Sequence, residues 1–174
     1  MPSERSLYRK MELVLEVAAE VEPGSLDELR IEIEGIPSFN TERYDAEKDD
    51  FVLGPSKPVI RRTVRWCVSL DLLSESGRLT RQGRSARRAG SFAKVVSKQV
   101  RLCLEVGGVD FAALNEAVTA CMAASPAILP TARELWERLS PEIRCSDFSR
   151  LLTLLSHCGV ATASQSRIYL SFVA

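Results

Sequence analysis

Residues 59–88 have the sequence VIRRTVRWCVSLDLLSESGRLTRQGRSARR, and eight of these thirty side chains are arginines. A guanidinium group is planar, stays charged at neutral pH and can donate two parallel hydrogen bonds to a phosphate or to the edge of a guanine base. A segment this rich in arginine is therefore a candidate binding surface for a polyanion. The competing interpretation is a solvated helix face whose charges are balanced elsewhere in the fold.

Charge is distributed unevenly along the sequence. The chain has 23 basic and 23 acidic side chains and hence no net charge. Residues 1–54 carry a net charge of −8, residues 55–101 of +10 and residues 102–174 of −2. A basic middle segment of this kind attracts nucleic acids, or it pairs with the acidic first third of the same chain.

An amphipathic helix is predicted to position the first group of arginines. Pro58 fits the first turn of a helix with Ser56 as N-cap, and the helix is expected to run to about residue 73. At about 100° per residue, the apolar side chains cover one broad arc. Arg61, Arg62 and Arg65 fall together in a separate arc, so this helix has a core face and a compact cationic face.

Two helices and a loop are predicted before this helix. Residues 6–21 have apolar positions at helical spacing, and Pro23 with Gly24 ends that helix. Ser25 and Glu28 fit a capping box that begins a second, short helix. The polar residues 37–51 show no clear period and are predicted to form a long loop.

A turn and a short strand, RLT, are predicted after the arginine-bearing helix. Thr80 then has the character of an N-cap for a helix from residue 81 to about residue 106. Gly107 and Gly108 end this helix and form a boundary between two domains.

The second half of the chain is predicted to repeat the order helix, helix, helix, hairpin. DFAALNEAVTACMAA is a helix, Thr131 caps a second helix that Pro141 closes, and Ser146 caps a third helix with Gly159 at its end. The last residues alternate, with Ile168, Leu170 and Phe172 on one face, which predicts a hairpin with SQS near its tip. The polar face of the third helix holds only one arginine, in the set Ser146, Ser149, Arg150, Thr153, Ser156 and His157.

This arrangement resembles the winged-helix superfamily. The closest stretch is VSLDLLSESGRLTRQGR, residues 68–84, where an apolar run of the L-x-x-LGLL type precedes a hairpin and an LT-x-x-G turn. Asp71 stands where glycine is frequent, and LLTLLSHCGVATASQSRIYLSF is the C-terminal match. The resemblance implies a mainly α protein with small β-hairpins. Two tandem winged-helix domains, residues 1–106 and 107–174, would be joined by a long helix.

The same resemblance implies that the third helix of the first domain lies in the major groove of DNA. The arginines on and after the wing would then contact phosphates or the minor groove. The nucleic-acid-binding residues implied in this way are Lys57, Arg61, Arg62, Arg65, Arg78, Arg81, Arg84, Arg87 and Arg88.

Catalytic and cofactor motifs are absent from the sequence. It lacks GxxxxGK[ST], GxGxxG, HExxH and GxSxG, and its single histidine, His157, leaves no histidine cluster for a metal. The five cysteines are odd in number, widely spaced and without a CxxC pair, which argues against a disulfide framework and against a zinc site. We therefore expect no enzyme activity, no metal, no cofactor and no small-molecule substrate.

The chain is expected to be cytoplasmic and without a membrane anchor. No apolar run approaches the roughly 20 residues of a membrane span, and glutamates at 12, 16 and 20 interrupt the apolar residues near the N-terminus.

The sequence thus predicts a non-enzymatic protein that binds duplex DNA through the first domain. It would act as a transcriptional regulator or as the DNA-engaging subunit of a larger prokaryotic system, such as a defence or replication complex. The alternative is a tandem winged-helix scaffold that binds a protein partner or a second copy of itself, similar in layout to the small kleisin-attached subunits of condensin-like complexes. A third hypothesis combines the two, with the acidic residues 42–50 shielding the arginines until a partner displaces them.

Overall fold

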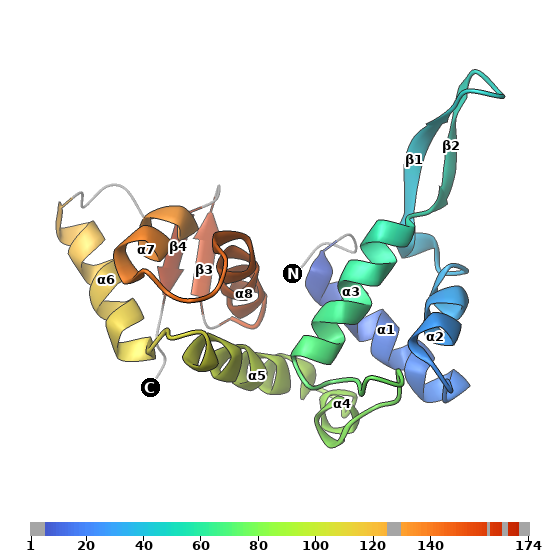
Figure 1. Cartoon of the computed structure of the whole chain (residues 1–174). Coiled ribbons are helices and arrows are strands. Elements are labelled where there is room, and N and C mark those ends of the chain that lie inside the picture. Colours follow the sequence, from blue (N-terminus) through green and yellow to red (C-terminus); the bar gives the residue numbers. More distant parts are fainter. Residues whose placement is uncertain (1–5, 125–129, 160, 165–166, 171–174) are drawn as a thin grey trace. The chain divides into compact units, whose positions relative to one another are not determined.

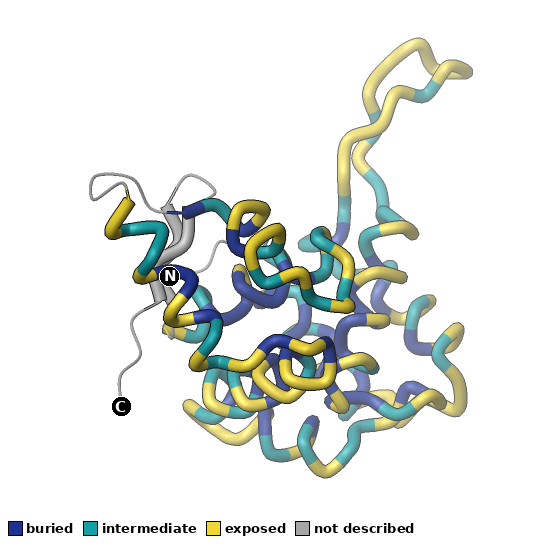
Figure 2. Tube along the Cα trace, turned by 60° about the vertical axis from the view of Figure 1, so that its left-hand side comes forward, coloured by how far each residue is buried: buried dark blue, intermediate teal, exposed yellow. Residues whose placement is uncertain are grey.

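The computed structural model describes residues 6–124, 130–159, 161–164 and 167–170. The chain is mainly helical, as predicted, and its internal contacts group it into two units, Met1–Phe92 and Ala93–Ala174. The sequence predicted a domain border after residue 106. Each unit has its own apolar core, visible as buried segments in Figure 2.

The first unit is a three-helix core with an inserted hairpin (Figure 1). Its helices α1, α2 and α3 pack on one another around Met11, Leu15, Leu29, Ile33 and Val64, which are all fully buried. Its elements in chain order are α1 (Leu7–Val21), α2 (Leu26–Ile33), the 3₁₀ turn η1 (Pro37–Phe39), β1 (Asn40–Asp45), β2 (Asp50–Pro55), α3 (Lys57–Ser69) and α4 (Arg81–Ala86).

Side-chain caps begin the first two helices. The Ser6 hydroxyl accepts a hydrogen bond from the Arg9 N–H, and the Ser25 hydroxyl accepts one from the Glu28 N–H, both at 3.2 Å. The Glu28 carboxylate accepts from the Gly24 N–H at 2.8 Å, one residue before the position that a capping box requires. The predicted start of α2 is confirmed, with this change of partner.

The predicted loop at residues 37–51 is wrong. Most of it, together with the residues up to Pro55, forms the antiparallel pair β1–β2, in register from Asn40↔Pro55 to Asp45↔Asp50. The charged residues of β1 hide any alternation of apolar side chains on that strand. Pairing is a cross-strand property, so a polar strand whose partner lies beyond a turn gives little local signal.

The exit from α3 is a Schellman motif. The Leu72 N–H donates to the Cys67 carbonyl at 2.8 Å and the Asp71 N–H to the Val68 carbonyl at 2.9 Å. Asp71 adopts φ 53°, the left-handed conformation for which glycine is preferred. The helix therefore ends at Ser69, four residues before the predicted end.

The wing predicted after α3 is reduced to one β-bridge between Leu73 and Leu79. The turn between them is closed by the Ser74 N–H, which donates to the Arg78 carbonyl at 2.8 Å. In the first unit the hairpin thus precedes the third helix, and the predicted order of elements is wrong at that point.

The single helix predicted from residue 81 to about 106 is interrupted. Thr80 caps α4 as predicted, with its hydroxyl accepting from the Gly83 N–H at 3.0 Å. The chain then leaves the helical conformation, and Gly90 has φ 72°, which only glycine adopts at little cost. A second helix, α5 (Phe92–Val106), follows and groups with the second unit almost entirely.

The second unit contains α5, α6 (Phe111–Ala124), α7 (Ala132–Leu139), α8 (Cys145–His157), β3 (Ala161–Ser164) and β4 (Arg167–Leu170). Leu104, Leu114, Leu135, Phe148 and Leu152 are fully buried in its core. The strands β3 and β4 form the predicted hairpin, and β3 packs against α8. The side chain of Phe172 lies outside the described residues.

The helix caps of the second unit agree with the sequence only in part. Thr131 and Glu134 form a complete capping box for α7, with bonds of 2.6 and 3.2 Å, as the position of Thr131 predicted. The predicted Ser146 cap is wrong, because α8 begins at Cys145 with Arg144 as N-cap. Arg144 provides no side-chain cap, but its guanidinium group pairs with Asp147 in the first turn.

Candidate nucleic-acid interface

The amphipathic character of α3 is confirmed by its burial pattern. Ile60, Thr63, Val64, Trp66 and Cys67 are buried against the core of the first unit. The Thr63 hydroxyl donates to the Val59 carbonyl at 2.9 Å, so this buried polar group is satisfied inside the helix. The opposite face is exposed and carries four cationic side chains, Lys57, Arg61, Arg62 and Arg65.

These four cations have no ion-pair partner among the residues that the structure describes. The ion pairs of the first unit there are Arg9–Glu12 and Arg30–Asp27, both within one helix. The interpretation of the arginines as charges neutralised inside the fold therefore lacks the contacts that it requires. Solvated guanidinium groups on one helix face are free to bind phosphates.

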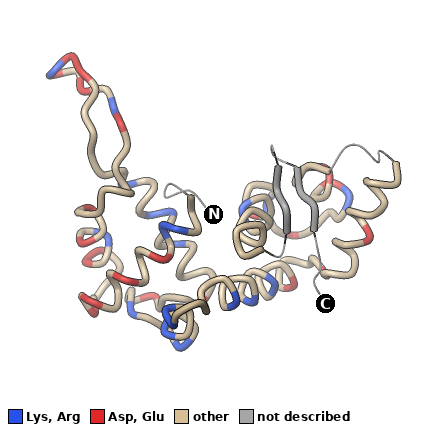
Figure 3. The backbone as a smooth tube through the Cα atoms, turned by 180° about the vertical axis from the view of Figure 1, so that it is seen from behind, with Lys and Arg blue, Asp and Glu red and all other residues tan. Residues whose placement is uncertain are grey.

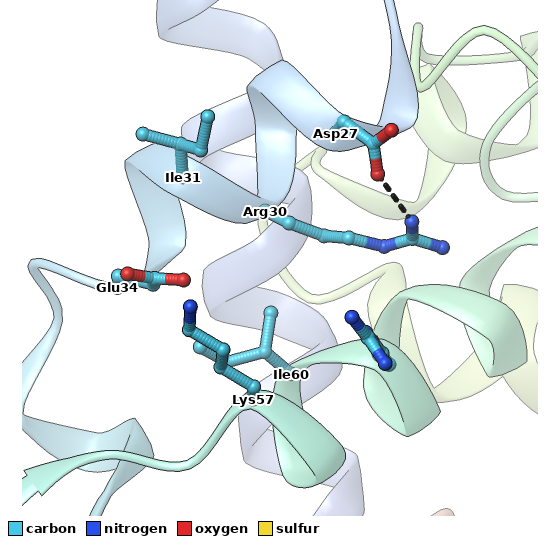
Figure 4. Close-up of a pocket in the computed structure, with 7 residues that line it drawn as sticks. Asp27, Arg30, Ile31, Glu34, Lys57 and Ile60 are labelled. Carbon is cyan, nitrogen blue, oxygen red and sulfur yellow. Dashed lines mark hydrogen bonds and ion pairs between the residues drawn. The ribbon is translucent and has the colours of Figure 1, made fainter.

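A small pocket borders the cationic face of α3 (Figure 4). It has a volume of about 230 Å³ and lies between α2 and α3. Asp27 and Arg30 form an ion pair of 2.6 Å at one side, and Lys57 lies beside Glu34 at the other without an ion pair between them. The complete lining is Asp27, Arg30, Ile31, Glu34, Lys57, Ile60 and Arg61. Arg30 was not predicted as part of this surface, because only the packing of α2 on α3 brings it there.

A second basic group lies on and after α4. Arg81, Arg84, Arg87 and Arg88 are all exposed. Arg84 is partly fixed, because its guanidinium group donates to the Leu79 carbonyl at 2.8 Å. Figure 3 shows basic residues gathered along α3 and α4.

Arg78 has a structural contact that the sequence did not reveal. Its Nε donates to the Pro23 carbonyl at 3.2 Å, which ties the turn after α3 to the start of α2. Gly77 lies so close to α2 that a Cβ there would be 3.2 Å from the Ser25 carbonyl oxygen. The turn therefore packs on the core. Arg78 is exposed, but its Nε–H already donates to the Pro23 carbonyl and helps to hold the turn in place.

Acidic side chains bound the basic surface on the side of α2. Asp27, Glu28 and Glu32 are exposed on that helix, and Asp27 lines the same pocket as Lys57 and Arg61. Figure 3 shows acidic residues at the β1–β2 turn, away from the basic residues of α3. No ion pair joins residues 42–50 to the arginines within the described chain. The hypothesis that this acidic segment shields the arginines therefore has no contact in its favour in this conformation.

The helix α8, which precedes the hairpin β3–β4, has a different surface. Its two basic neighbours, Arg144 and Arg150, both pair with Asp147, at 2.9 and 3.8 Å. Ser146 and Thr153 are exposed, whereas Ser149, Ser156 and His157 are half-buried. Partial burial lowers the pKa of His157, so this side chain is neutral at pH 7 and adds no positive charge. The helix α8 therefore presents a nearly neutral face.

Two of the cysteines, Cys67 and Cys158, are buried enough to change their chemistry. Complete burial raises the pKa of the Cys67 thiol, and burial raises the pKa of Cys158 to about 12. Neither thiol is a thiolate at neutral pH, the form that acts as a nucleophile. Among the described residues no group of three or more His, Cys, Asp or Glu side chains could hold a metal ion, and no helix is long and apolar enough to cross a bilayer.

The chain matches no protein-family model, no curated protein and no solved structure. The resemblance to the winged-helix superfamily therefore stays a prediction from residues 68–84 and from the order of the elements.

Proposed function

We propose that this chain is a non-enzymatic DNA-binding protein whose first unit engages duplex DNA through α3. One observation carries the proposal: Lys57, Arg61, Arg62 and Arg65 are all exposed on one face of α3, without an ion pair among the described residues. Arg81, Arg84, Arg87 and Arg88 would extend the phosphate contacts beyond this helix.

The architecture that we infer is a tandem pair of winged-helix units. In the second unit, α6, α7 and α8 are followed directly by the hairpin β3–β4, which is the order of a winged helix. In the first unit, α1, α2 and α3 have the same order, the β1–β2 hairpin is inserted before α3, and the wing is shortened to one bridge. In winged-helix proteins the third helix is the one that enters the major groove.

Binding of this kind is driven mainly by charge. Each phosphate that a cation neutralises releases counterions, so the logarithm of the affinity falls with the logarithm of the salt concentration, with a slope of about −0.9 per contact. Four to eight contacts predict a slope between roughly −4 and −7. Because the wing is shortened, α3 alone would contact the base edges. We therefore expect the chain to bind duplex DNA of any sequence, with only a small difference in affinity between sequences.

The biological role that fits such a surface is a transcriptional regulator or the DNA-engaging subunit of a larger complex. The nearly neutral face of α8 would then be available for a protein contact rather than for DNA. A protein-binding scaffold is the function that remains if the first unit does not bind DNA.

The test is a fluorescence-anisotropy titration of a random-sequence duplex at about 50 and 150 mM salt. The wild type is compared with Arg61→Ala/Arg62→Ala/Arg65→Ala. The matched control is Arg133→Ala/Arg138→Ala/Arg144→Ala, which removes three exposed arginines from the second unit and changes the net charge equally.

We expect the α3 variant to lose at least tenfold in affinity and the salt slope to become less steep by about 2.7, because three contacts are lost. The control should stay within about threefold of the wild type. Equal losses in both variants would show that net charge alone attracts DNA. If the wild type does not bind at low salt, the DNA-binding proposal is wrong and the scaffold function replaces it.

A further inference from the structure

The hairpin β1–β2 stands away from the helices of the first unit as an arm, defined here as residues 40–55 (Figure 1). The foot of the arm is closed by the Ser56 N–H, which donates to the Phe39 carbonyl at 3.0 Å. Beyond the foot the arm is largely exposed (Figure 2). Its large apolar side chains are no exception, since Tyr44 is 56% exposed, Phe51 67% and Leu53 68%.

These three side chains share one face of the arm. Residues directly opposite in an antiparallel pair lie on the same side, and neighbours along a strand alternate. Tyr44 is opposite Phe51, and Leu53 is two residues further along the same strand, opposite Glu42. The rings of Tyr44 and Phe51 meet edge to face with centroids 5.6 Å apart. The arm therefore carries a continuous apolar strip, Tyr44, Phe51 and Leu53.

An arm of this kind is incomplete by itself. An isolated two-stranded hairpin is marginally stable in water, and stability requires further strands or another surface on its apolar face. Both outer edges of the arm also leave backbone groups without a strand partner in the described chain. A second surface packed on the apolar strip would supply this stability.

The charge of the arm changes from negative at its tip to positive at its foot. This change indicates what kind of surface packs on the apolar strip. At the tip, Asp45 lies directly opposite Asp50, and Glu47 and Asp49 are in the turn with a single cation, Lys48. Like charges placed opposite each other destabilise a hairpin unless cations approach them. No ion pair of the described residues involves these carboxylates.

One cation of the arm, Arg43, lies on β1 two residues from Asp45, and further cations lie at the foot. The strand β2 leads directly into α3, so Lys57 and Arg61 are beside the foot. The Lys10 ammonium group lies 5.9 Å from the centre of the Phe39 ring, also at the foot. The carboxylates Asp27 and Glu34 of the neighbouring pocket reduce but do not reverse this positive charge, since Arg30, Lys57 and Arg61 line the same pocket.

We propose that the arm is a self-association surface and that its partner is the arm of a second copy of this chain, packed antiparallel on the Tyr44, Phe51 and Leu53 strip. A two-fold axis across the middle of the arm places each acidic tip at the other copy's basic foot. Six residues per strand span about 20 Å, so the two arms overlap along their whole length. The same contact covers both apolar strips and brings the cations of each foot to the acidic turn of the other copy, where Glu47 and Asp49 lie.

The acidic tip excludes duplex DNA as the occupant, because the phosphates would meet carboxylates there. The strip is narrow, so the dimer is expected to be weak and concentration-dependent. It also falls apart more readily at high salt, because part of the contact is ionic.

The first experiment measures the mass of the full-length chain by sedimentation equilibrium over a wide range of concentrations. We expect the wild type to pass from monomer to dimer, and Phe51→Ser/Leu53→Ser to raise the dissociation constant at least tenfold. Val52→Ser is the matched control, because Val52 is on the opposite face of the same strand and loses a similar strand preference. A wild type that stays monomeric at all concentrations, or equal losses with Val52→Ser, would overturn the proposal.

A charge-exchange experiment remains informative if the serine variants disturb the hairpin. Glu47→Lys/Asp50→Lys reverses the tip, and Lys57→Glu/Arg61→Glu reverses the foot. Each variant alone should dimerise at least tenfold more weakly than the wild type. A mixture should form a mixed dimer, because the reversed tip meets the reversed foot and the unchanged foot meets the unchanged tip, so that both pairs of ends are complementary. If the mixture is no better than either variant alone, the antiparallel arrangement is wrong.

Discussion

The helices α3 and α8 each have one buried apolar face and one polar face, but the two polar faces differ in charge. On α3, four exposed cations have no ion-pair partner in the described chain, whereas at α8 both nearby arginines pair with Asp147. Both helices bury a complete apolar face, so the packing that holds them is similar. The difference teaches that the fold provides a helix face, and that the few residues on that face determine what it can bind.

The two units also differ in which atoms pack against a glycine of their helices. In the first unit, Gly83 of α4 lies against the backbone at Leu72, so that a Cβ would stand 2.0 Å from the carbonyl oxygen. In the second unit, a Cβ at Gly107 would stand 2.3 Å from the Ile143 Cγ2, which is a side-chain atom. A Cβ at Gly83 would therefore meet backbone at the exit of α3, whereas a Cβ at Gly107 would meet the Ile143 side chain. The segment before α8 is held in addition by the Glu142 N–H, which donates to the Gly107 carbonyl at 3.1 Å.

The largest expected effect tests this difference in packing. Gly83→Ala should destabilise the first unit by about 3 kcal/mol, because a backbone carbonyl cannot move aside, and Gly107→Ala should cost the second unit about 1 kcal/mol. Urea unfolding measures both, since Trp66 and Trp136 each report on one unit. Gly54→Ala is the control, because nothing lies within 4 Å of a Cβ there. Equal costs at Gly83 and Gly107 would contradict the comparison.

A second prediction concerns a variant in which α8 is given a cationic face like that of α3. Ser149→Arg/Thr153→Arg adds two cations one turn apart on the polar face of α8. If the second unit is a winged helix, duplex affinity should rise about tenfold and the salt slope should steepen by about 1.8. Anisotropy titration checks both quantities.

The control for this transfer is Asn115→Arg/Thr119→Arg, which adds the same charge at two exposed positions of α6. An equal gain from the α6 variant would mean that any added charge suffices and that α8 has no special position.

A third prediction compares helix starts. Thr131→Ala removes the capping box of α7 and should lower the free energy of unfolding of the second unit by about 1 kcal/mol. Ser56 precedes α3 but makes no side-chain capping bond, so Ser56→Ala should change stability by only a few tenths of a kcal/mol. Urea midpoints give both values, and Thr131→Ser should keep most of the stability. A larger loss at Ser56 than at Thr131 would refute this assignment of caps.

The smallest expected effect is a pH dependence confined to the second unit. His157 is the only histidine of the chain, and partial burial lowers its pKa in the folded state. The unfolded chain therefore binds the proton more readily, so the stability of the second unit is complete above the unfolded pKa of about 6.5 and declines as the pH falls below it. Urea midpoints followed through Trp136 between pH 7.5 and 5.5 should show this decline. His157→Gln should remove it, and a decline that persists in this variant would rule out His157 as its source.

Local signals predicted much of the fold. The caps at Thr80 and Thr131, the helical period of α1 and the polar arc of α3 depend on residues within a few positions of one another, and all are confirmed. The arm was missed because β1 is polar and its pairing partner lies beyond a turn. The break before α5 was missed because glycine permits a left-handed residue without requiring one.

The candidate site was predictable to the same extent. The sequence placed Arg61, Arg62 and Arg65 on an exposed face, because helical periodicity alone separates them from the apolar residues of α3. It did not show that Arg78 bonds the Pro23 carbonyl, or that Arg30 joins Lys57 and Arg61 at one pocket. The cause in each case is distance along the chain, since the contacting residues are brought together only by the packing of α2.

By itself, the sequence determined which elements are helical, which of their faces are apolar and where the positive charge of the chain is concentrated. These properties follow from side-chain chemistry repeated at a fixed local period. Only the tertiary structure decided that the acidic residues 45–50 lie at the tip of an arm and that an apolar strip beside them is uncovered. Strand pairing and helix packing join residues far apart in the chain, and their geometry is not contained in any local period.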